Sequence, residues 1–176
     1  MREYQYLTTS GNSSACENRN IPREVDAPLA RSNVLLKCSS IGTLTIPINT
    51  DAGTSYNLVN LNLDTGKFRK PCIKLDFLGN ILTNAASITL NFQVFKQCKD
   101  QFAPTAVGPV WTFSRVADTI EEANSFTFAV CDCDHCDCGC CNYSVVATIA
   151  GTTPTGGVTT INNASLMATV VESADC

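Results

Sequence analysis

The chain has 176 residues, of which 44% are hydrophobic, and a formal net charge of −4. This length and apolar content are typical of one domain with a true core. The 12 Lys and Arg residues are scattered rather than gathered into a basic stripe, so we expect no nucleic acid partner.

No targeting segment is evident. The first residues lack the apolar stretch of a secretory signal, and no later segment is long and apolar enough to span a membrane. We therefore expect neither membrane insertion nor conventional secretion. A cysteine-rich chain normally belongs to an oxidising compartment. Release by cell lysis, as for spore-surface material, would reconcile the two observations, and a cytosolic metal protein or a removed signal peptide are the alternatives.

Residues 1–31 differ from the rest of the chain. They are rich in Ser, Asn, Thr and charged residues, and they show neither helical nor strand periodicity. Such a segment should not form a core of its own. We interpret it as an extended amino-terminal arm that carries one cysteine, Cys16, and connects to a neighbouring subunit. Residues 32–176 would then form the folded domain.

Alternating apolar and polar residues predict strands through most of that domain. The clearest strand covers 87–97, where four apolar side chains alternate with polar ones: Ile88, Leu90, Phe92 and Val94. Further strands are expected at 34–41, 43–48, 56–63, 72–82, 110–116, 125–133, 139–149 and 166–171. Only 117–123 has the composition of a short helical turn, and 151–164 is expected to be a loop. This pattern predicts an all-β fold, a single antiparallel jelly roll or β-sandwich of about eight or nine strands.

Six of the eleven cysteines fall within 131–141, whose sequence is Cys-Asp-Cys-Asp-His-Cys-Asp-Cys-Gly-Cys-Cys. Cysteine at this density indicates metal ligation, thiol exchange or covalent cross-linking rather than packing alone. We expect the run to be the end of a β-hairpin with its tip at 134–137. One face of this hairpin, with Phe128 opposite Tyr143, would pack on the core.

The other face of the predicted hairpin would display thiols in opposed pairs. Cys131 would face Cys140, and Cys133 would face Cys138, at a spacing that a disulfide tolerates. Together with Cys141, which would lie opposite Val130, these cysteines form a candidate array for hairpin disulfides or for docking of a partner.

Metal binding is the alternative use of the run. Cys133, His135, Cys136 and Cys138 could hold zinc or copper. A structural zinc site normally draws two Cys-x-x-Cys turns around one point, whereas only one such gap occurs here. We therefore favour cross-linking without a cofactor, while a reduced, inert hairpin with His135 as a solvated turn residue also stays open.

No feature of the sequence indicates catalysis. An activated thiolate would need a neighbouring base or a helix amino terminus, and no helix is expected beside the run. No Ser-His-Asp set or glycine-rich phosphate loop is visible. We expect a protein that is not an enzyme and has no small-molecule substrate.

The odd number of cysteines prevents complete pairing within one monomer. Cys38, Cys72 and Cys98 lie in or beside predicted strands and could equally be buried or bonded. Cys16 lies in the polar arm, where we expect no core to bury it. We expect Cys16 to bond in trans to a cysteine of the hairpin face or tip, such as Cys136, with the terminal Cys176 as the second choice.

These features resemble the subunits of bacterial endospore appendages. The likeness covers the arm around Cys16, the β domain from about residue 33 and the 131–141 run. The chain is also similar to small cysteine-rich clostridial spore-surface proteins of unassigned function, in which a Cys-Asp-Cys run interrupts a strand-rich domain. This chain departs from the appendage subunits in its longer arm, its single arm cysteine in place of a close pair, and its denser cluster.

The resemblance implies a structural protein. Appendage subunits are single jelly-roll domains whose cysteine-bearing arm cross-links stacked neighbours into fibres. By this resemblance we expect self-assembly of the chain into a helical filament outside the cell or on the spore surface, locked by inter-subunit disulfides and released from the mother cell without a signal peptide. A glycan-binding jelly roll would share the fold, but the sequence has no signature of such a site.

Overall fold

The computed structural model describes residues 34–99, 101–116, 121–133, 139–151 and 155–172. These residues form ten strands, which are β1 (Val34–Cys38), β2 (Gly42–Ile46), β3 (Ser55–Asp64), β4 (Pro71–Asn84), β5 (Ala86–Cys98), β6 (Thr105–Arg115), β7 (Glu121–Asp132), β8 (Cys140–Ile149), β9 (Thr155–Gly156) and β10 (Thr159–Glu172). No helix in the described part of the chain could cross a membrane.

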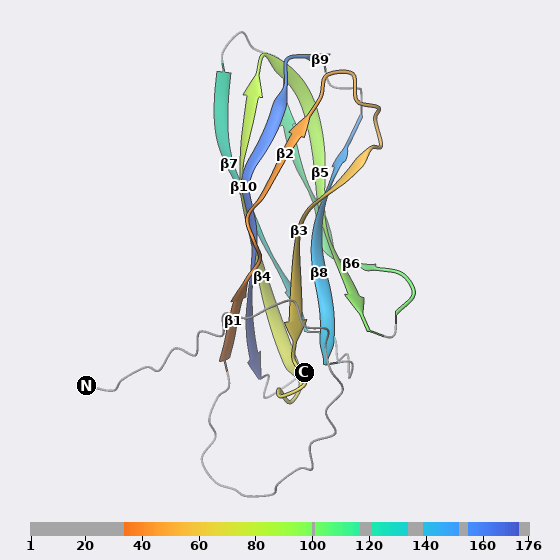
Figure 1. Ribbon diagram of the computed structural model, residues 1–176, viewed down its shortest axis with the longest axis vertical. Coiled ribbons are helices and arrows are strands. Elements are labelled where there is room, and N and C mark those ends of the chain that lie inside the picture. Colours follow the sequence, from red (N-terminus) through yellow and green to blue (C-terminus); the bar gives the residue numbers. More distant parts are fainter. Residues whose placement is uncertain (1–33, 100, 117–120, 134–138, 152–154, 173–176) are drawn as a thin grey trace, which may run out of the picture.

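The strands form two antiparallel sheets that pack face to face (Figure 1). Sheet I has the order β1-β10-β4-β7, and β2 also pairs with β10. Sheet II has the order β3-β8-β5-β6, and the two-residue β9 adds to β5. The prediction of a single all-β jelly roll or β-sandwich is therefore confirmed, with one more short strand than expected.

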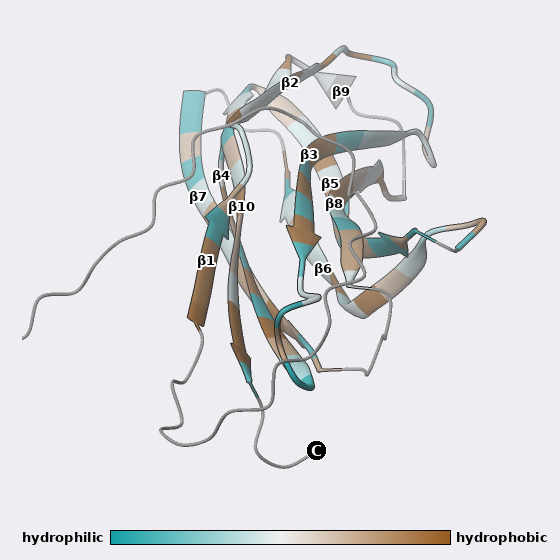
Figure 2. Ribbon diagram, turned by 60° about the horizontal axis from the view of Figure 1, so that its bottom comes forward, coloured by the Kyte–Doolittle hydropathy of each residue, from teal (hydrophilic) through white to brown (hydrophobic). Residues whose placement is uncertain are grey.

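Alternation along the strands produces the core. Apolar side chains of both sheets are buried between the layers and alternate along the strands with more exposed residues. The strand ribbons of Figure 2 accordingly alternate between hydrophobic and hydrophilic colours. Aromatic rings connect the layers at its centre. Phe128 of sheet I stacks on Trp111 of sheet II with 4.2 Å between ring centroids, and Phe77 lies 5.8 Å from Phe92. Such ring pairs add to the hydrophobic stabilisation of the core.

The last strand is longer than the sequence pattern predicted. We expected a loop over 151–164, but β10 begins at Thr159. The register shifts between Asn162 and Ser165, and Asn163 has a φ of 54°. This β-bulge moves the buried positions from odd to even numbers, so that both Ile161 and Leu166 are buried. A simple search for period 2 cannot follow that change.

The expected helical turn over 117–123 is wrong where the structure describes it. Glu121 and Glu122 belong to β7, where they pair with Asn84 and Thr83 of β4. Glu122 also forms an ion pair with Arg115 at the end of β6. Tertiary pairing therefore overrides the weak helical preference of the two glutamates.

The predicted hairpin over the cysteine run is also wrong. β7 pairs with β4 in sheet I, whereas β8 pairs with β3 and β5 in sheet II. The chain thus crosses from one layer to the other at this point. Phe128 and Tyr143 do face the core, but from different sheets. Alternation identifies the buried face of a strand and leaves its pairing partner undetermined.

Candidate functional site at the cysteine-rich end

One end of the sandwich collects most of the cysteines. β3, β5 and β7 end, and β4, β6 and β8 begin, toward this end, in the lower half of Figure 1. Of the seven cysteines in the described residues, six lie at or next to these strand ends: Cys72, Cys98, Cys131, Cys133, Cys140 and Cys141. The seventh, Cys38, ends β1.

The first disulfide joins Cys72 to Cys133 and is confined to sheet I. In the β4–β7 register Ile73 lies opposite Asp132, so these cysteines form the next pair along the two strands. Ile73 is buried, and Cys72 therefore lies on the outer face of the sheet. This bond closes the end of the β4–β7 ladder.

The second disulfide joins Cys98 to Cys141 and is confined to sheet II. The two residues are direct partners in the β5–β8 register, and Cys98 is only 2% exposed. Cys140 is disulfide-bonded as well. This end of the protein is therefore largely in the oxidised state.

Two cysteines of the described residues remain free thiols, namely Cys38 and Cys131, and both are exposed. Cys131 lies opposite Lys74 on the outer face of sheet I. Cys38 lies opposite Met167 on the same face, at the other edge of the sheet. These thiols are accessible to a second molecule without any rearrangement of the core.

The surface around the thiols is partly apolar. In the registers of sheet I, Val34 and Val171 lie in one row with the Cys72–Cys133 disulfide. Leu36 lies in the adjacent row with Thr169 and Lys74, which is also the row of Cys131. Val34 and Leu36 are 62% and 66% exposed. We call this surface the sulfur face; it comprises Val34, Leu36, Cys38, Cys72, Cys131, Cys133, Met167 and Val171.

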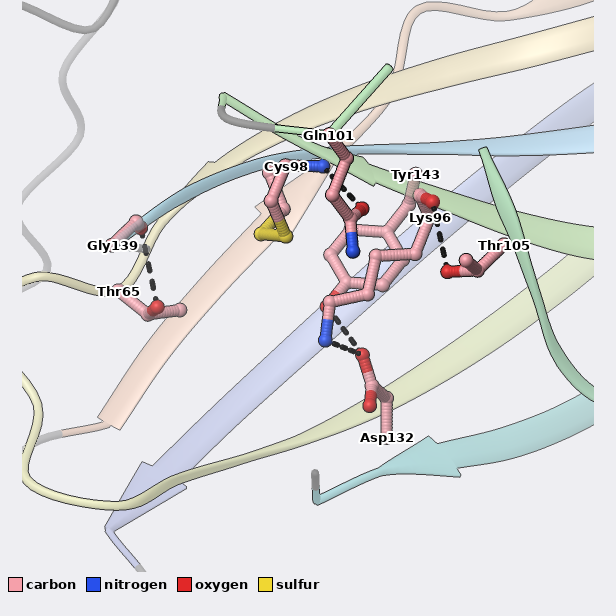
Figure 3. Close-up of a disulfide and its surroundings, with 9 residues drawn as sticks. Thr65, Lys96, Cys98, Gln101, Thr105, Asp132, Gly139 and Tyr143 are labelled. Carbon is pink, nitrogen blue, oxygen red and sulfur yellow. Dashed lines mark hydrogen bonds and ion pairs between the residues drawn. A yellow bond between two sulfur atoms is a disulfide. The ribbon is translucent and has the colours of Figure 1, made fainter. Parts of the chain in front are cut away.

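A buried charged network lies inside the same end (Figure 3). The Lys96 ammonium lies 2.7 Å from a carboxylate oxygen of Asp132, and their side chains are 7% and 4% exposed. The Tyr143 hydroxyl donates a hydrogen bond of 2.6 Å to the same oxygen. Since Asp132 belongs to sheet I and the other two residues to sheet II, this network joins the layers.

A groove reaches this network from the surface. It has a volume of about 400 Å³, and Lys96, Asp132, Thr105, Gly108 and Cys131 are among its lining residues. It lies where β6, at the edge of sheet II, approaches β7, at the edge of sheet I. The buried charges and an exposed thiol thus share one opening.

The structure changes the roles expected within the run. Cys131 does not pair with Cys140, because the first is a free thiol and lies in the other sheet. Cys133 pairs with Cys72, not with Cys138, which lies outside the described residues. Cys141 bonds to Cys98 instead of lying opposite Val130.

The residues predicted to link subunits lie outside the part of the chain that the structure describes. Cys16, Cys136 and Cys176 lie outside the described residues, as do His135 and Cys138 of the alternative metal set. The fourth member of that set, Cys133, is already in a disulfide and cannot offer a thiolate in this state. The described residues contain no group of three His, Cys, Asp or Glu side chains that could hold a metal.

Sequence reasoning missed the Lys96–Asp132 pair, although a signal was present. Lys96 continues the even-numbered buried positions of its strand after Phe92 and Val94, and Asp132 does the same after Phe128 and Val130. Opposite charges at inward positions near the ends of two strands predict a buried ion pair, because a lone buried charge is strongly disfavoured.

The two sheets, their antiparallel registers and their shared core define an antiparallel β-sandwich of the jelly-roll class. The chain belongs to the family described as a domain of unknown function (DUF4489), whose model matches residues 32–171. No curated protein matches the sequence.

Solved structures resemble it in fold. Eiger TNF from S. frugiperda is 11% identical, with a TM-score of 0.43 and coverage of 81% of this chain and 94% of the other. The VP2 protein of infectious bursal disease virus is also 11% identical, with a TM-score of 0.43 and coverage of 81% of this chain. The match covers 36% of that longer protein. A family 11 carbohydrate-binding module from Clostridium thermocellum is 12% identical, with a TM-score of 0.36 and coverages of 79% and 89%.

Proposed function

We propose that the protein is a structural, non-enzymatic subunit that assembles with copies of itself into a filament outside the cell or on the spore surface. Disulfides between subunits would lock the filament, with Cys16 of the amino-terminal arm as one partner. The observation that carries this proposal is the pair of exposed free thiols, Cys38 and Cys131, in a domain whose neighbouring cysteines are already oxidised.

Chemistry and surface composition support this proposal. Under conditions that oxidise Cys72, Cys98, Cys133 and Cys141, a remaining exposed thiol is available to a partner with a matching thiol or disulfide. The sulfur face places such thiols among exposed apolar side chains, which favour association with another protein surface. The odd cysteine count requires at least one thiol to remain free or to bond outside the monomer.

Strand edges offer a way to set the register of assembly. β7 lies at one edge of sheet I and pairs only with β4 among the described strands. Its 12 residues contain neither Gly nor Pro, so that the strand is regular. β6 approaches it near Val130, Phe128 and Glu122, and the backbone groups of β7 that β6 leaves uncovered would be available for pairing with a neighbouring subunit. A head-to-tail contact of this kind whose rotation does not close produces an open helical fibre.

The test uses the full chain, purified without reductant and compared with its Cys16→Ser variant. We expect electron microscopy to show filaments of the wild type, and multimers that survive boiling in detergent but fall to monomers with a strong reductant. Cys16→Ser should lose much of that resistance. Assembled material that is indifferent to reductant would contradict the covalent part of the proposal. Stoichiometric zinc or copper, with loss of structure on chelation, would favour the metal-binding module instead.

A further inference from the structure

The Lys96–Asp132 contact brings an amine and a carboxyl group together inside the sandwich. Lys96 Nζ lies 2.7 Å from Asp132 Oδ2, and both side chains are more than nine-tenths buried. Figure 3 shows the two groups pointing toward each other from opposite sheets, with the Tyr143 hydroxyl on the same carboxylate oxygen. The other two ion pairs of the described residues, Lys74–Asp76 and Arg115–Glu122, are both more exposed to water.

Burial changes the chemistry open to this pair. Removing two charges from water is costly, and their attraction repays this cost only in part. Transfer of one proton from the ammonium to the carboxylate removes both charges and leaves a nucleophilic amine beside a carboxylic acid. Held in contact, such groups react far faster than the same groups in solution.

We propose that Lys96 and Asp132 condense to form an intramolecular isopeptide bond. The lone pair of Lys96 Nζ attacks Asp132 Cγ and forms the new C–N bond. One carboxyl oxygen then leaves as water with two hydrogens, and the nitrogen keeps one. An ammonium and a carboxylate thus become an amide and one water molecule, with no change in oxidation state and no co-reactant.

Tyr143 is placed to assist this step. Its hydroxyl donates to Asp132 Oδ2 over 2.6 Å, where it can supply a hydrogen bond to the oxygen that develops charge or departs. Tyr143 is also the direct partner of Lys96 in the β5–β8 register, and Lys96 Nζ lies 5.9 Å from its ring centroid. One strand pair therefore positions both the nucleophile and the hydroxyl.

The surrounding structure fits a permanent bond at this position. Cys133, which is bonded to Cys72, directly follows Asp132 in the chain, and Cys98, which is bonded to Cys141, lies two residues after Lys96. A disulfide therefore restrains the strand end next to each reacting group. The groove beside them offers the departing water a way out. Both of these disulfides join strands of the same sheet, whereas the proposed amide would join sheet I to sheet II.

The test is the intact mass of the full chain, denatured and fully reduced so that disulfides do not contribute. We expect a mass below that of the sequence by one water molecule, and a proteolytic digest containing a branched peptide that joins the Lys96 segment to the Asp132 segment. Lys96→Arg keeps the positive charge but lacks the amine, and it should show the full sequence mass. Tyr143→Phe should show a smaller fraction of cross-linked molecules.

The wild-type measurement decides the proposal even if a variant fails to fold. A wild-type mass equal to that of the sequence would overturn it, and Lys96 and Asp132 would then be a buried ion pair only. A mass deficit that the digest assigns to another residue, such as cyclisation of a single aspartate, would overturn it as well. Neither result depends on whether the protein forms filaments.

Discussion

The Cys98–Cys141 disulfide lies two residue pairs beyond Lys96 and Tyr143 in the β5–β8 register. All four side chains lie on the inner face of sheet II, because their positions continue the buried alternation of both strands. The cysteine bond and the charged network therefore form one continuous inner layer at this end of the sandwich. In contrast, the Cys72–Cys133 disulfide lies on the outer face of sheet I.

This difference predicts unequal contributions of the two disulfides to stability. Loss of a native disulfide from a small domain costs about 2–5 kcal/mol. Loop length hardly separates the two bonds, since sequence separations of 43 and 61 enter only as a logarithm. Burial does separate them, because Cys98 is 2% exposed and its truncation also removes core contacts.

We therefore expect the double substitution Cys98→Ala with Cys141→Ala to lower the free energy of unfolding by roughly 1 kcal/mol more than Cys72→Ala with Cys133→Ala. Urea denaturation of the two double variants, followed by tryptophan fluorescence of Trp111, provides the comparison. A larger loss from the outer pair would contradict the assignment of Cys98–Cys141 to the core.

Gly108 provides a second prediction, because two separate features of its position, the backbone angle and the space around it, disfavour any other residue. Its φ is 69°, and an added Cβ would collide with the Val130 side chain on β7. Gly53 also has a positive φ, of 86°, but an added Cβ would meet open space. The two glycines therefore separate backbone strain from steric overlap.

We expect Gly53→Ala to destabilise the fold by about 1 kcal/mol, from backbone strain alone. Gly108→Ala should cost about 2–4 kcal/mol, because the β6–β7 approach must also open. Thermal or urea denaturation of both variants measures the difference. Equal effects would show that β6 can move away from β7 without cost, and would argue against close contact between these sheet edges.

The sequence was sufficient for the buried faces of most strands, with the bulged β10 as an exception, and insufficient for the pairings. Alternation correctly assigned Phe128 and Tyr143 to the core, because side-chain direction in a strand is a local property. It could not show that these residues belong to different sheets, because pairing depends on contacts between distant segments. The assumption that 131–141 closes a hairpin therefore failed.

The candidate site, too, could be predicted in its local features but not in its long-range contacts. The density of cysteine marked the end of the molecule where the described disulfides lie, yet Cys72 and Cys98 are 61 and 43 residues away in sequence from the cysteines to which they bond. Asp132 was visible in the sequence only as one of several acidic residues in the run. Its importance depends on Lys96 in the opposite sheet, which only the three-dimensional arrangement brings to it.

The buried ion pair leads to a third prediction, on stability. Asp132→Leu alone removes the carboxylate next to a buried ammonium, and we expect a loss of about 3–5 kcal/mol. Lys96→Met combined with Asp132→Leu removes both charges and replaces them with apolar side chains of similar size. The double variant should therefore be more stable than Asp132→Leu.

Urea denaturation of Lys96→Met, Asp132→Leu and the double variant gives the comparison. None of the three can form the proposed amide, so the differences among these three variants report on burial of charge alone. A double variant that is less stable than both single variants would indicate that the two charges are not buried against each other.

The final prediction concerns the accessibility of the thiols on the sulfur face. In the monomer without reductant, an alkylating reagent should modify Cys38 and Cys131, because both are free and exposed, and should spare Cys72, Cys98, Cys133 and Cys141 in their disulfides. Peptide mass mapping identifies the modified positions, and Cys38→Ser and Cys131→Ser are matched controls that each remove one signal.

If the sulfur face is an interface between subunits, assembly should protect at least one of these two thiols. Equal modification of both in monomers and in assembled material would exclude the sulfur face from the contact, and modification of Cys98 in the native monomer would contradict the fold itself.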